Sequence, residues 1–562
     1  MRFVLPLILV FILGGSSLGA ADPASVQPPC SPPIGANLEV VAPWEAQILF
    51  VDVMKRASEW IAFELAENGA FDTGADIPLD PDGYPLELPY QPADPDAAAQ
   101  GVFSILFTDM QGHYPAGTYT LSFDGSGLLL LSGSNGEQAF TAGGTYPVQI
   151  DPTQGDLYLH LIVSDPDDRI RNIHLVMPGH ETTYTTQPFY PPLVERLSDF
   201  EAVRFSQTMR TNDGDYPCDN GVAVTDPACE KGWGLRPTTS YYTQATGRGV
   251  ALEHLIDLAN AADVDPWFCI QHGATDEHIW QFAETVRTRL APGKRFYVEL
   301  SNELFNYDTP YPQSIWCRDS GLALGLSTDP EEARRRMVAK RSAEMFHIFE
   351  QVFQGLTDVE LVKVLPGWLA DAPGNDAILT AMDDPTLNPS GVQADVLAVG
   401  AYFGYMISIE ILVNGESQTI TVPEILTRAR NNLTLDRSDP TDGGIIESLQ
   451  HLLDENRVVA SAHGIGMVAY EGGQHILEYN GWNNDPVLGD KLIAANRDEE
   501  MGRIYDRMLD VWCGSGGGLF LHYSLVRRPT VAWGSFGSLE WTTQDPDASP
   551  KHRTLRQRAA GQ

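Results

Sequence analysis

Apolar and polar positions change their pattern along the chain near residue 100 and again near residue 180. Between 101 and 177, short alternating runs such as GTYTLSFDG (117–125) and DLYLHLIV (156–163) are separated by turn residues at regular intervals. A period of two is typical of antiparallel strands that bury one face. We therefore predict a small antiparallel β-sandwich over residues 85–180.

After residue 180, apolar runs of strand length alternate with segments of helical periodicity. The helical segments are 249–262, 276–290, 331–354, 444–460 and 497–512. The strand-like runs, counting one before the sandwich, are 34–41, 200–206, 266–272, 296–300, 359–365, 394–402, 464–471 and 518–523. Eight strands that alternate with helices predict an α/β fold, a (β/α)8 TIM barrel, with the sandwich inserted between its first and second strands.

The N-terminus has the pattern of a secretory signal peptide. Arg2 is followed by the apolar run 3–13 and by the small residues of 19–21. The apolar run is shorter than a membrane span, so we expect export without membrane insertion. We assign 1–21 to the signal peptide, 22–84 to a linker and the first barrel strand, and 85–180 to the insert. The rest of the barrel takes 181–545, and 546–562 is expected to be a polar, frayed tail.

Charge and composition limit the classes of partner. The 562 residues carry a formal net charge of −39, with a pI near 4.5. Nucleic acid is excluded as a partner because its phosphates require Lys and Arg. The 43% of hydrophobic residues excludes wholesale disorder. Such acidity fits a secreted protein that acts on neutral or cationic material. Oligomeric state is left open.

Six cysteines in an exported chain predict disulfides. Cys218 and Cys229 bracket a loop rich in Gly, Asp and Pro and are expected to pair. Cys269 and Cys317 are a second candidate pair between neighbouring strand-end loops, and connectivity cannot be read from the sequence for Cys30 and Cys513. We expect no metal and no cofactor, because we find no CxxC, no HExxH, no P-loop, no GxSxG nucleophile elbow and no GxGxxG after a strand.

Two carboxylates follow apolar strands at positions where a core strand has no use for them. In RFYVELSNELFN (295–306) the apolar run stops at Ser301, Asn302 and Glu303, and in GIGMVAYEGGQH (464–475) Glu471 stands directly before two glycines. The carboxyl ends of barrel strands face the ligand crevice. Two carboxyl groups on separate strand ends are what glycoside hydrolysis requires, and the amide of Asn302 suits a hydrogen bond to a sugar hydroxyl.

The chain resembles the clan A glycoside hydrolases, which are retaining enzymes on a TIM barrel. The resemblance rests on SNE in the fourth strand and a Glu on the seventh. More closely it resembles a group of secreted bacterial cellulase-like proteins, through IGANL (34–38), RF with MRTN (204–212) and YEGGQH (470–475). It covers roughly residues 34–540 and implies Glu303 as acid/base, Glu471 as nucleophile and Asn302 as the partner of the sugar 2-hydroxyl.

The resemblance also implies supporting residues, each with a plainer alternative. Arg204 matches an arginine that keeps the nucleophile ionised, or it forms a structural salt bridge. Tyr402 matches a tyrosine that hydrogen-bonds the nucleophile, or it belongs to the core. His272 lines the subsite at the cleavage point, or it is a buried histidine with its hydrogen bonds satisfied. Trp533, in the segment after the eighth strand, is a candidate floor under the sugar ring.

Together these features predict a secreted, retaining glycoside hydrolase that cleaves a β-linked polysaccharide of β-glucan or mannan type, with an open, endo-acting groove. The loops at 304–328 and 403–440 are expected to wall that groove. The alternative is a non-catalytic carbohydrate-binding or surface-assembly protein on the same barrel. A polysaccharide lyase is a further rival, and the net charge disfavours its uronate substrates.

Overall fold

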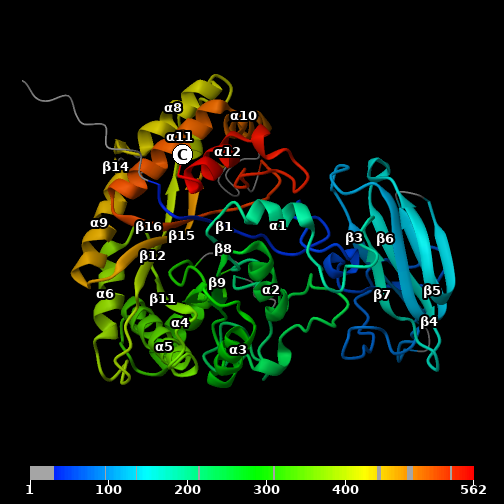
Figure 1. The fold of residues 1–562 in the computed structure, drawn as a ribbon. Coiled ribbons are helices and arrows are strands. Elements are labelled where there is room, and N and C mark those ends of the chain that lie inside the picture. The colour runs from blue at the N-terminus through cyan, green and yellow to red at the C-terminus, as the bar shows by residue number, and fades with distance from the viewer. Residues whose placement is uncertain are drawn as a thin grey trace, which may run out of the picture.

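A closed barrel of eight parallel strands forms the body of the protein (Figure 1). The computed structural model describes residues 31–561 apart from 95–96, 134–135, 213–215, 308–310, 439–444, 478–484 and 532–533, so the predicted signal peptide lies outside the described residues. In order around the barrel the strands are β1 (Ile34–Asn37), β16 (Gly517–His522), β15 (Gly466–Gln474), β12 (Val396–Phe403), β11 (Glu360–Pro366), β10 (Arg295–Leu300), β9 (Asp265–Ile270) and β8 (Ala202–Arg204). The predicted (β/α)8 barrel and its eight strands are confirmed.

The barrel interior is packed with side chains, which explains why its strands are almost continuously apolar. Trp267 of β9 stacks on Tyr297 of β10, with ring centroids 5.0 Å apart. Small and branched residues from five of the strands fill the space around this pair: Ala202, Val362, Val364, Ala398, Val468, Leu519 and Leu521. A filled interior leaves the carboxyl-terminal mouth as the place where polar strand ends meet.

Helices surround the barrel, and five of them lie where helical periodicity predicted them. These are α2 (Leu252–Ala262), α3 (Asp276–Arg289), α5 (Pro330–Val352), α9 (Leu449–Ala462) and α11 (Glu499–Gly514). The others described are α1 (Pro191–Leu197), α4 (Pro312–Ala323), α6 (Ala372–Met382), α7 (Ile407–Val413), α8 (Val422–Asn432), α10 (Pro486–Arg497) and α12 (Pro550–Ala559).

The segments expected to be long loops after β10 and β12 contain helices instead. The first holds α4, which begins at a proline, and the second holds α7 and α8. α8 begins with a capping box, in which Thr421 and Glu424 satisfy each other's backbone N–H groups, followed by Pro at its first turn. The prediction failed because α4 has few apolar residues and proline was read only as a loop former.

The inserted domain is an antiparallel sheet that lies between β1 and β8 in sequence and beside the barrel in space (Figure 1). Its strands are β2 (Ile61–Glu64), β3 (Gln100–Phe107), β4 (Gly117–Gly133), β5 (Gln138–Ile150), β6 (Leu157–Ser164) and β7 (Arg171–Val176). The long strand β4 pairs with β5, β6 and β7, so all six strands are hydrogen-bonded into one sheet. The predicted antiparallel insert is therefore confirmed, with β2 extending it toward the N-terminus.

The C-terminal segment, expected to be frayed, ends in the helix α12. Ser549 caps its first turn, and Arg558 pairs with Asp506 at 2.9 Å and with Asp510 at 2.5 Å, both on α11. Its sequence is so polar that periodicity gave no signal. Ion pairs with α11 take the place of an apolar stripe, and the expectation of a frayed tail was wrong.

The disulfide between Cys218 and Cys229 is confirmed, with a Cα–Cα distance of 5.3 Å. The candidate pair Cys269 and Cys317 is wrong: both are free and buried. Cys269 points into the barrel from β9, where its Sγ donates to Glu299, whereas Cys317 lies on α4. Cys513 is disulfide-bonded. Among the described residues no helix combines the length and apolar character that a membrane span requires.

Candidate active site

Arg204, the last residue of β8, is fully buried and holds two carboxylates at the mouth of the barrel. Its Nε and Nη2 donate to Glu299 Oε2 and Oε1 at 2.9 and 3.0 Å, and its Nη1 donates to Glu471 Oε1 at 2.9 Å. Asn37 Oδ1 and Asn302 Oδ1 accept further bonds at 3.3 and 2.7 Å. Because a guanidinium presents its donors in a fixed fork, Arg204 sets the positions of side chains from β1, β10 and β15.

Aromatic and apolar side chains of the barrel interior exclude water from this ion-pair network. The guanidinium carbon of Arg204 lies 5.8 Å from the ring centroid of Trp267 and 5.1 Å from that of Tyr470. Trp267 Nε1 also donates to Glu299 at 2.8 Å. Burial raises the pKa of the Glu299 carboxyl, and the Arg204 charge opposes that rise. Glu299 is thus the fixed counter-charge that orients Arg204 toward Glu471.

Glu471 reaches Arg204 because the ladder between β12 and β15 has a bulge. Val399 pairs with Ala469, but the next residue, Gly400, pairs with Glu471, so one residue of β15 has no partner in the ladder. A bulge re-aims side chains and breaks the alternation of faces. As a result the ring of Tyr470 and the carboxyl of Glu471 both face the site, although they are neighbours in sequence.

Tyr402, at the end of β12, completes the surroundings of Glu471. Its hydroxyl donates to Glu471 Oε2 at 2.8 Å, while Arg204 occupies Oε1. Burial raises the pKa of Glu471, Arg204 opposes this, and the neighbouring Glu303 adds to the rise. Each carboxylate oxygen of Glu471 therefore has a strong donor, one of them cationic.

Glu303 lies three residues beyond β10, on a backbone that turns back on itself. Ser301 and Glu303 both have positive φ, 54° and 44°, a conformation that is uncommon for residues with a side chain. Such conformations occur where the surrounding structure holds a functional group in place. Asn306 Nδ2 donates to Glu303 Oε2 at 3.0 Å, and the Tyr470 hydroxyl lies 3.4 Å from Oε1.

The two carboxyls have different surroundings, which affect the stability of their charged forms differently. Burial is the largest cause that raises the pKa of Glu303, and the amide of Asn306, the distant Arg204 and two tyrosine hydroxyls lower it only in part. Glu471 has direct contact with the guanidinium and a shorter tyrosine bond. The direct contacts favour the charged form of Glu471, against burial that raises the pKa of both carboxyls and brings that of Glu471 to about 7.

The remaining residues singled out in the sequence divide into those near the network and those apart from it. The amide of Asn302 accepts from Arg204 and donates to Asn212 Oδ1 at 2.8 Å, so the protein itself uses both of its ends. His272 is buried, donates from Nε2 to the Val224 carbonyl at 3.1 Å and packs near Trp316. Trp533 lies outside the described residues.

Several residues of the site were missed from the sequence. Asn37 ends the first barrel strand, and Glu299 stands inside an apolar strand at the parity of the inward-facing Tyr297. A charged residue at an inward position was a usable signal for Glu299. Tyr311 hydrogen-bonds Glu303, and Tyr523, directly after β16, is close enough to Glu471 for that carboxylate to raise its pKa. Nothing in the sequence distinguished these tyrosines from core residues.

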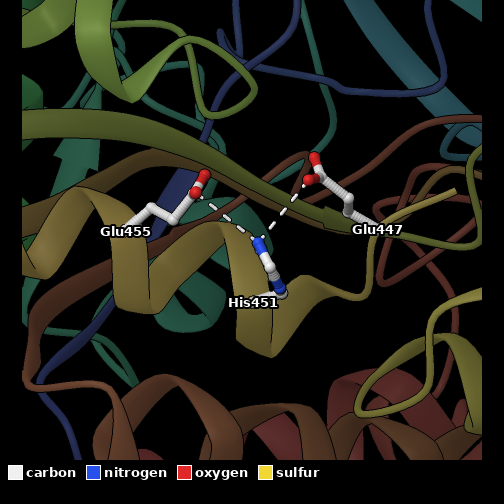
Figure 2. A group of neighbouring side chains, drawn as sticks. All are labelled: Glu447, His451 and Glu455. Carbon is white, nitrogen blue, oxygen red and sulfur yellow. Dashed lines mark ion pairs between the residues drawn. The ribbon is translucent and has the colours of Figure 1, made fainter. Parts of the chain in front are cut away.

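One group of described side chains has ligand atoms close enough together to hold a metal ion, and it lies at the start of α9. Figure 2 shows His451 and Glu455 on this helix and Glu447 just before it, and all three are exposed. His451 Nε2 lies 3.5 Å from a carboxylate oxygen of each glutamate. These ion pairs account for the arrangement without a metal.

Comparisons with known proteins find only structural matches, and these are weak. No family model matches the chain, and no curated protein matches it. A 4-O-α-L-rhamnosyl-β-D-glucuronidase from Fusarium oxysporum 12S is 9% identical with a TM-score of 0.35, and the match covers 68% of this chain and 66% of that one, just under two thirds. A GH10 protein from Paenibacillus barcinonensis is 11% identical with a TM-score of 0.32, and the match covers 65% and 89%. An endo-β-1,4-mannanase from Cellulomonas fimi is 12% identical with a TM-score of 0.26, over 56% and 60%.

Proposed function

We propose that the protein is a retaining glycoside hydrolase that cleaves a β-linked, neutral polysaccharide by double displacement. The observation that carries the proposal is the unequal environment of the two carboxyls. Arg204 and Tyr402 donate to the two oxygens of Glu471 and favour its charged form, whereas burial raises the pKa of Glu303 and favours its protonated form. An ionised nucleophile beside a protonated acid is the arrangement that this reaction needs.

In the first step, Glu471 attacks the anomeric carbon and its Oε1–Arg204 and Oε2–Tyr402 bonds keep the attacking carboxylate ionised and oriented. Glu303 gives its proton to the glycosidic oxygen, so the leaving sugar departs as a neutral alcohol. In the second step the ionised Glu303 takes a proton from water, the water oxygen bonds to the anomeric carbon, and the ester bond to Glu471 breaks. Two inversions at one carbon give net retention.

The test is reducing-sugar release from β-glucans, mannans, xylans and galactans by the wild type, Glu303→Ala and Glu471→Ala. Glu447→Ala, which removes an exposed carboxylate just before α9, is the matched control. We expect the control to match the wild type and both site variants to lose activity. Hydrolysis that survives loss of Glu471 would refute the assignment of the nucleophile.

Stereochemistry distinguishes this mechanism from inversion. We expect the first-formed product to keep the β configuration when proton NMR follows the reaction before mutarotation. Azide should accelerate Glu303→Ala on a substrate with a good leaving group and give a β-glycosyl azide, because azide needs no general base. An α product from the wild type would overturn double displacement.

Export forms part of the same proposal. The apolar segment at 3–13 and the small residues at 19–21 support removal of a signal peptide, and the net charge of −39 is compatible with an extracellular life. We expect the protein recovered outside the cytoplasm to begin at Asp22 when its N-terminus is sequenced. An intact Met1 on the exported form would contradict this.

A further inference from the structure

Two exposed tryptophans belong to segments that follow barrel strands on the side of the mouth. Trp368 comes two residues after β11 and has 46% of its surface exposed. Trp44 follows β1 and has 48% exposed. Isolated exposed apolar residues are common on proteins, so exposure alone carries no function. The local structure around each tryptophan is what distinguishes it.

Trp368 forms a stacked aromatic pair with Phe305, a residue of the segment that carries the candidate acid Glu303. Its ring lies parallel to that of Phe305, with centroids 5.3 Å apart and an angle of 9° between the planes. Phe305 is two residues beyond Glu303, so this pair involves the same segment after β10 that carries the candidate acid. One face of the indole is covered by Phe305, and the surface that stays exposed is available to a ligand.

The backbone of Trp368 is fixed by a buried asparagine. Asn375 Oδ1 accepts from the Trp368 amide at 3.0 Å, and Asn375 Nδ2 donates to the Trp368 carbonyl at 2.9 Å. The same Nδ2 reaches Asn456 Oδ1 on α9 at 2.7 Å. Holding an exposed ring in place in advance lowers the entropy that a ligand must overcome on binding.

The segment that carries Trp44 is fixed in a similar way. Arg56 is buried, and its Nη2 donates to the carbonyls of Ala42, Pro43 and Glu45 at 2.9, 3.3 and 2.7 Å. These carbonyls lie directly on either side of Trp44. The Pro43 carbonyl also accepts from the Thr108 amide at 3.1 Å, so the insert supports this segment. The charge of Arg527, beyond β16, acts on Glu45, which places the segment near the mouth.

The order of the strands puts the two tryptophans on opposite sides of the mouth. β1 and β11 are four strands apart in either direction around the closed barrel. β10, which precedes Glu303, lies in one half of the barrel between β1 and β11, and β15, which carries Glu471, lies in the other half. A linear ligand that contacts both tryptophans would therefore cross the mouth between the strands that carry the two carboxyls.

We propose that Trp368, backed by Phe305, and Trp44 are two sugar-binding platforms on opposite sides of the barrel mouth, so that the ligand is a neutral β-linked glycan chain cut internally. The inference rests on the proposed hydrolase function. The apolar C–H faces of equatorially substituted sugar rings pack on aromatic planes, and each platform takes one ring of the chain. Scission then occurs between the two occupied ends.

Binding is tested apart from catalysis in a Glu471→Gln background. Cellohexaose, mannohexaose and xylohexaose are the probes, each titrated by calorimetry. We expect at least one to bind, and Trp368→Ala or Trp44→Ala to weaken that binding by roughly 10- to 100-fold, the range for loss of a well-packed tryptophan. Trp368→Tyr should restore most of the affinity, because it returns a flat ring. The matched control is Trp280→Ala on α3, since Trp280 is 39% exposed and lies on the outer helical layer.

Length dependence gives a second readout. Disaccharides cannot span both platforms, so each should be affected by one tryptophan substitution at most, while hexasaccharides should be affected by both. Hexasaccharide affinity that is unchanged in both alanine variants, or binding by none of the three probes, overturns the platforms. The reducing-sugar assay on the wild type tests the proposed hydrolase function separately from these binding measurements. If the wild type cleaves but both tryptophan variants bind hexasaccharide as tightly as their Glu471→Gln parent, this inference alone is refuted.

Discussion

Replacing Tyr402 with Phe removes a single hydroxyl and tests whether the charge of Glu471 is held as the structure indicates. The hydroxyl donates to Glu471 Oε2 at 2.8 Å, and the phenyl ring of the variant fills the same space. The ring contact with His475, at 5.3 Å between centroids, does not involve the hydroxyl. The substitution therefore alters the electrostatics of the nucleophile with little change in packing.

The size of the effect follows from the strength of the lost bond. A hydrogen bond to a charged group contributes about 1.5 to 3 kcal/mol, and one pKa unit corresponds to about 1.4 kcal/mol. The hydroxyl lowers the pKa of Glu471, so its loss should raise that pKa by about 1 to 2 units. The acid limb of kcat/KM, which requires ionised Glu471, moves to higher pH by the same amount. On that limb activity should fall roughly 10- to 100-fold, with partial recovery at higher pH.

The assay is a pH profile of kcat/KM on the substrate found by reducing-sugar release, for the wild type, Tyr402→Phe and a control. Tyr119→Phe is the control, because Tyr119 is also buried and donates to the Pro115 carbonyl at 2.6 Å within the insert. The control should leave the profile unmoved. A uniform loss of activity in Tyr402→Phe, with the acid limb in its original place, would show that the tyrosine only positions Glu471 and would refute the electrostatic reasoning.

Three other substitutions test the supporting structure. Glu299→Gln should lower the free energy of unfolding in urea by about 3 to 5 kcal/mol, because Arg204 loses a buried charged partner. It should also shift the acid limb of kcat/KM to lower pH, because the Glu299 charge raises the pKa of Glu471, and an unshifted limb would contradict this coupling. Burial lowers the pKa of Lys231 from 10.5 to about 7, so the unfolded chain binds more protons between these values and the wild type loses stability as pH falls through that range. At or below pH 7, Lys231→Met should therefore be more stable than the wild type by several kcal/mol, because the pKa differs by roughly 3 units and each unit corresponds to about 1.4 kcal/mol. Near pH 10.5 the gain should be small, and a difference in thermal midpoint that does not change with pH would be inconsistent with this cause. Cys218→Ser opens a disulfide loop with a sequence separation of 11 and should lower the unfolding free energy by up to about 3 kcal/mol. Equal unfolding free energies for the variant, the reduced wild type and the oxidised wild type would contradict this contribution of the disulfide.

The barrel was predictable because each of its strands is an apolar run of the right length between helical segments. Two of the helices that escaped prediction lack that signal. α12 is held by Arg558 and a serine cap, and α4 begins at a proline inside a segment that reads as a loop. Polar contacts between distant segments stabilise such helices, and no local pattern records them.

The site was predictable to the extent that its residues end strands. Glu303, Glu471, Arg204 and Tyr402 all occupy such positions, and the structure brings them together. Tyr470 was not predictable as a site residue, because strict alternation places it on the face opposite to Glu471. The bulge that cancels this alternation depends on the register of β12 against β15, which the sequence of one strand does not specify.

The closure of the barrel also fixes when the site can form during folding. β1 pairs with β16, and Asn37 donates to the Tyr470 carbonyl across 433 residues of sequence. The insert, by contrast, pairs only strands within 61–176 and can form while the rest of the chain is still being made. Contacts of such long range are the slowest to form, since a long loop must close before they contribute. Arg204 therefore acquires its full set of partners only after β15, which carries Glu471, has been made, so a nascent chain has no assembled carboxylate pair before that strand.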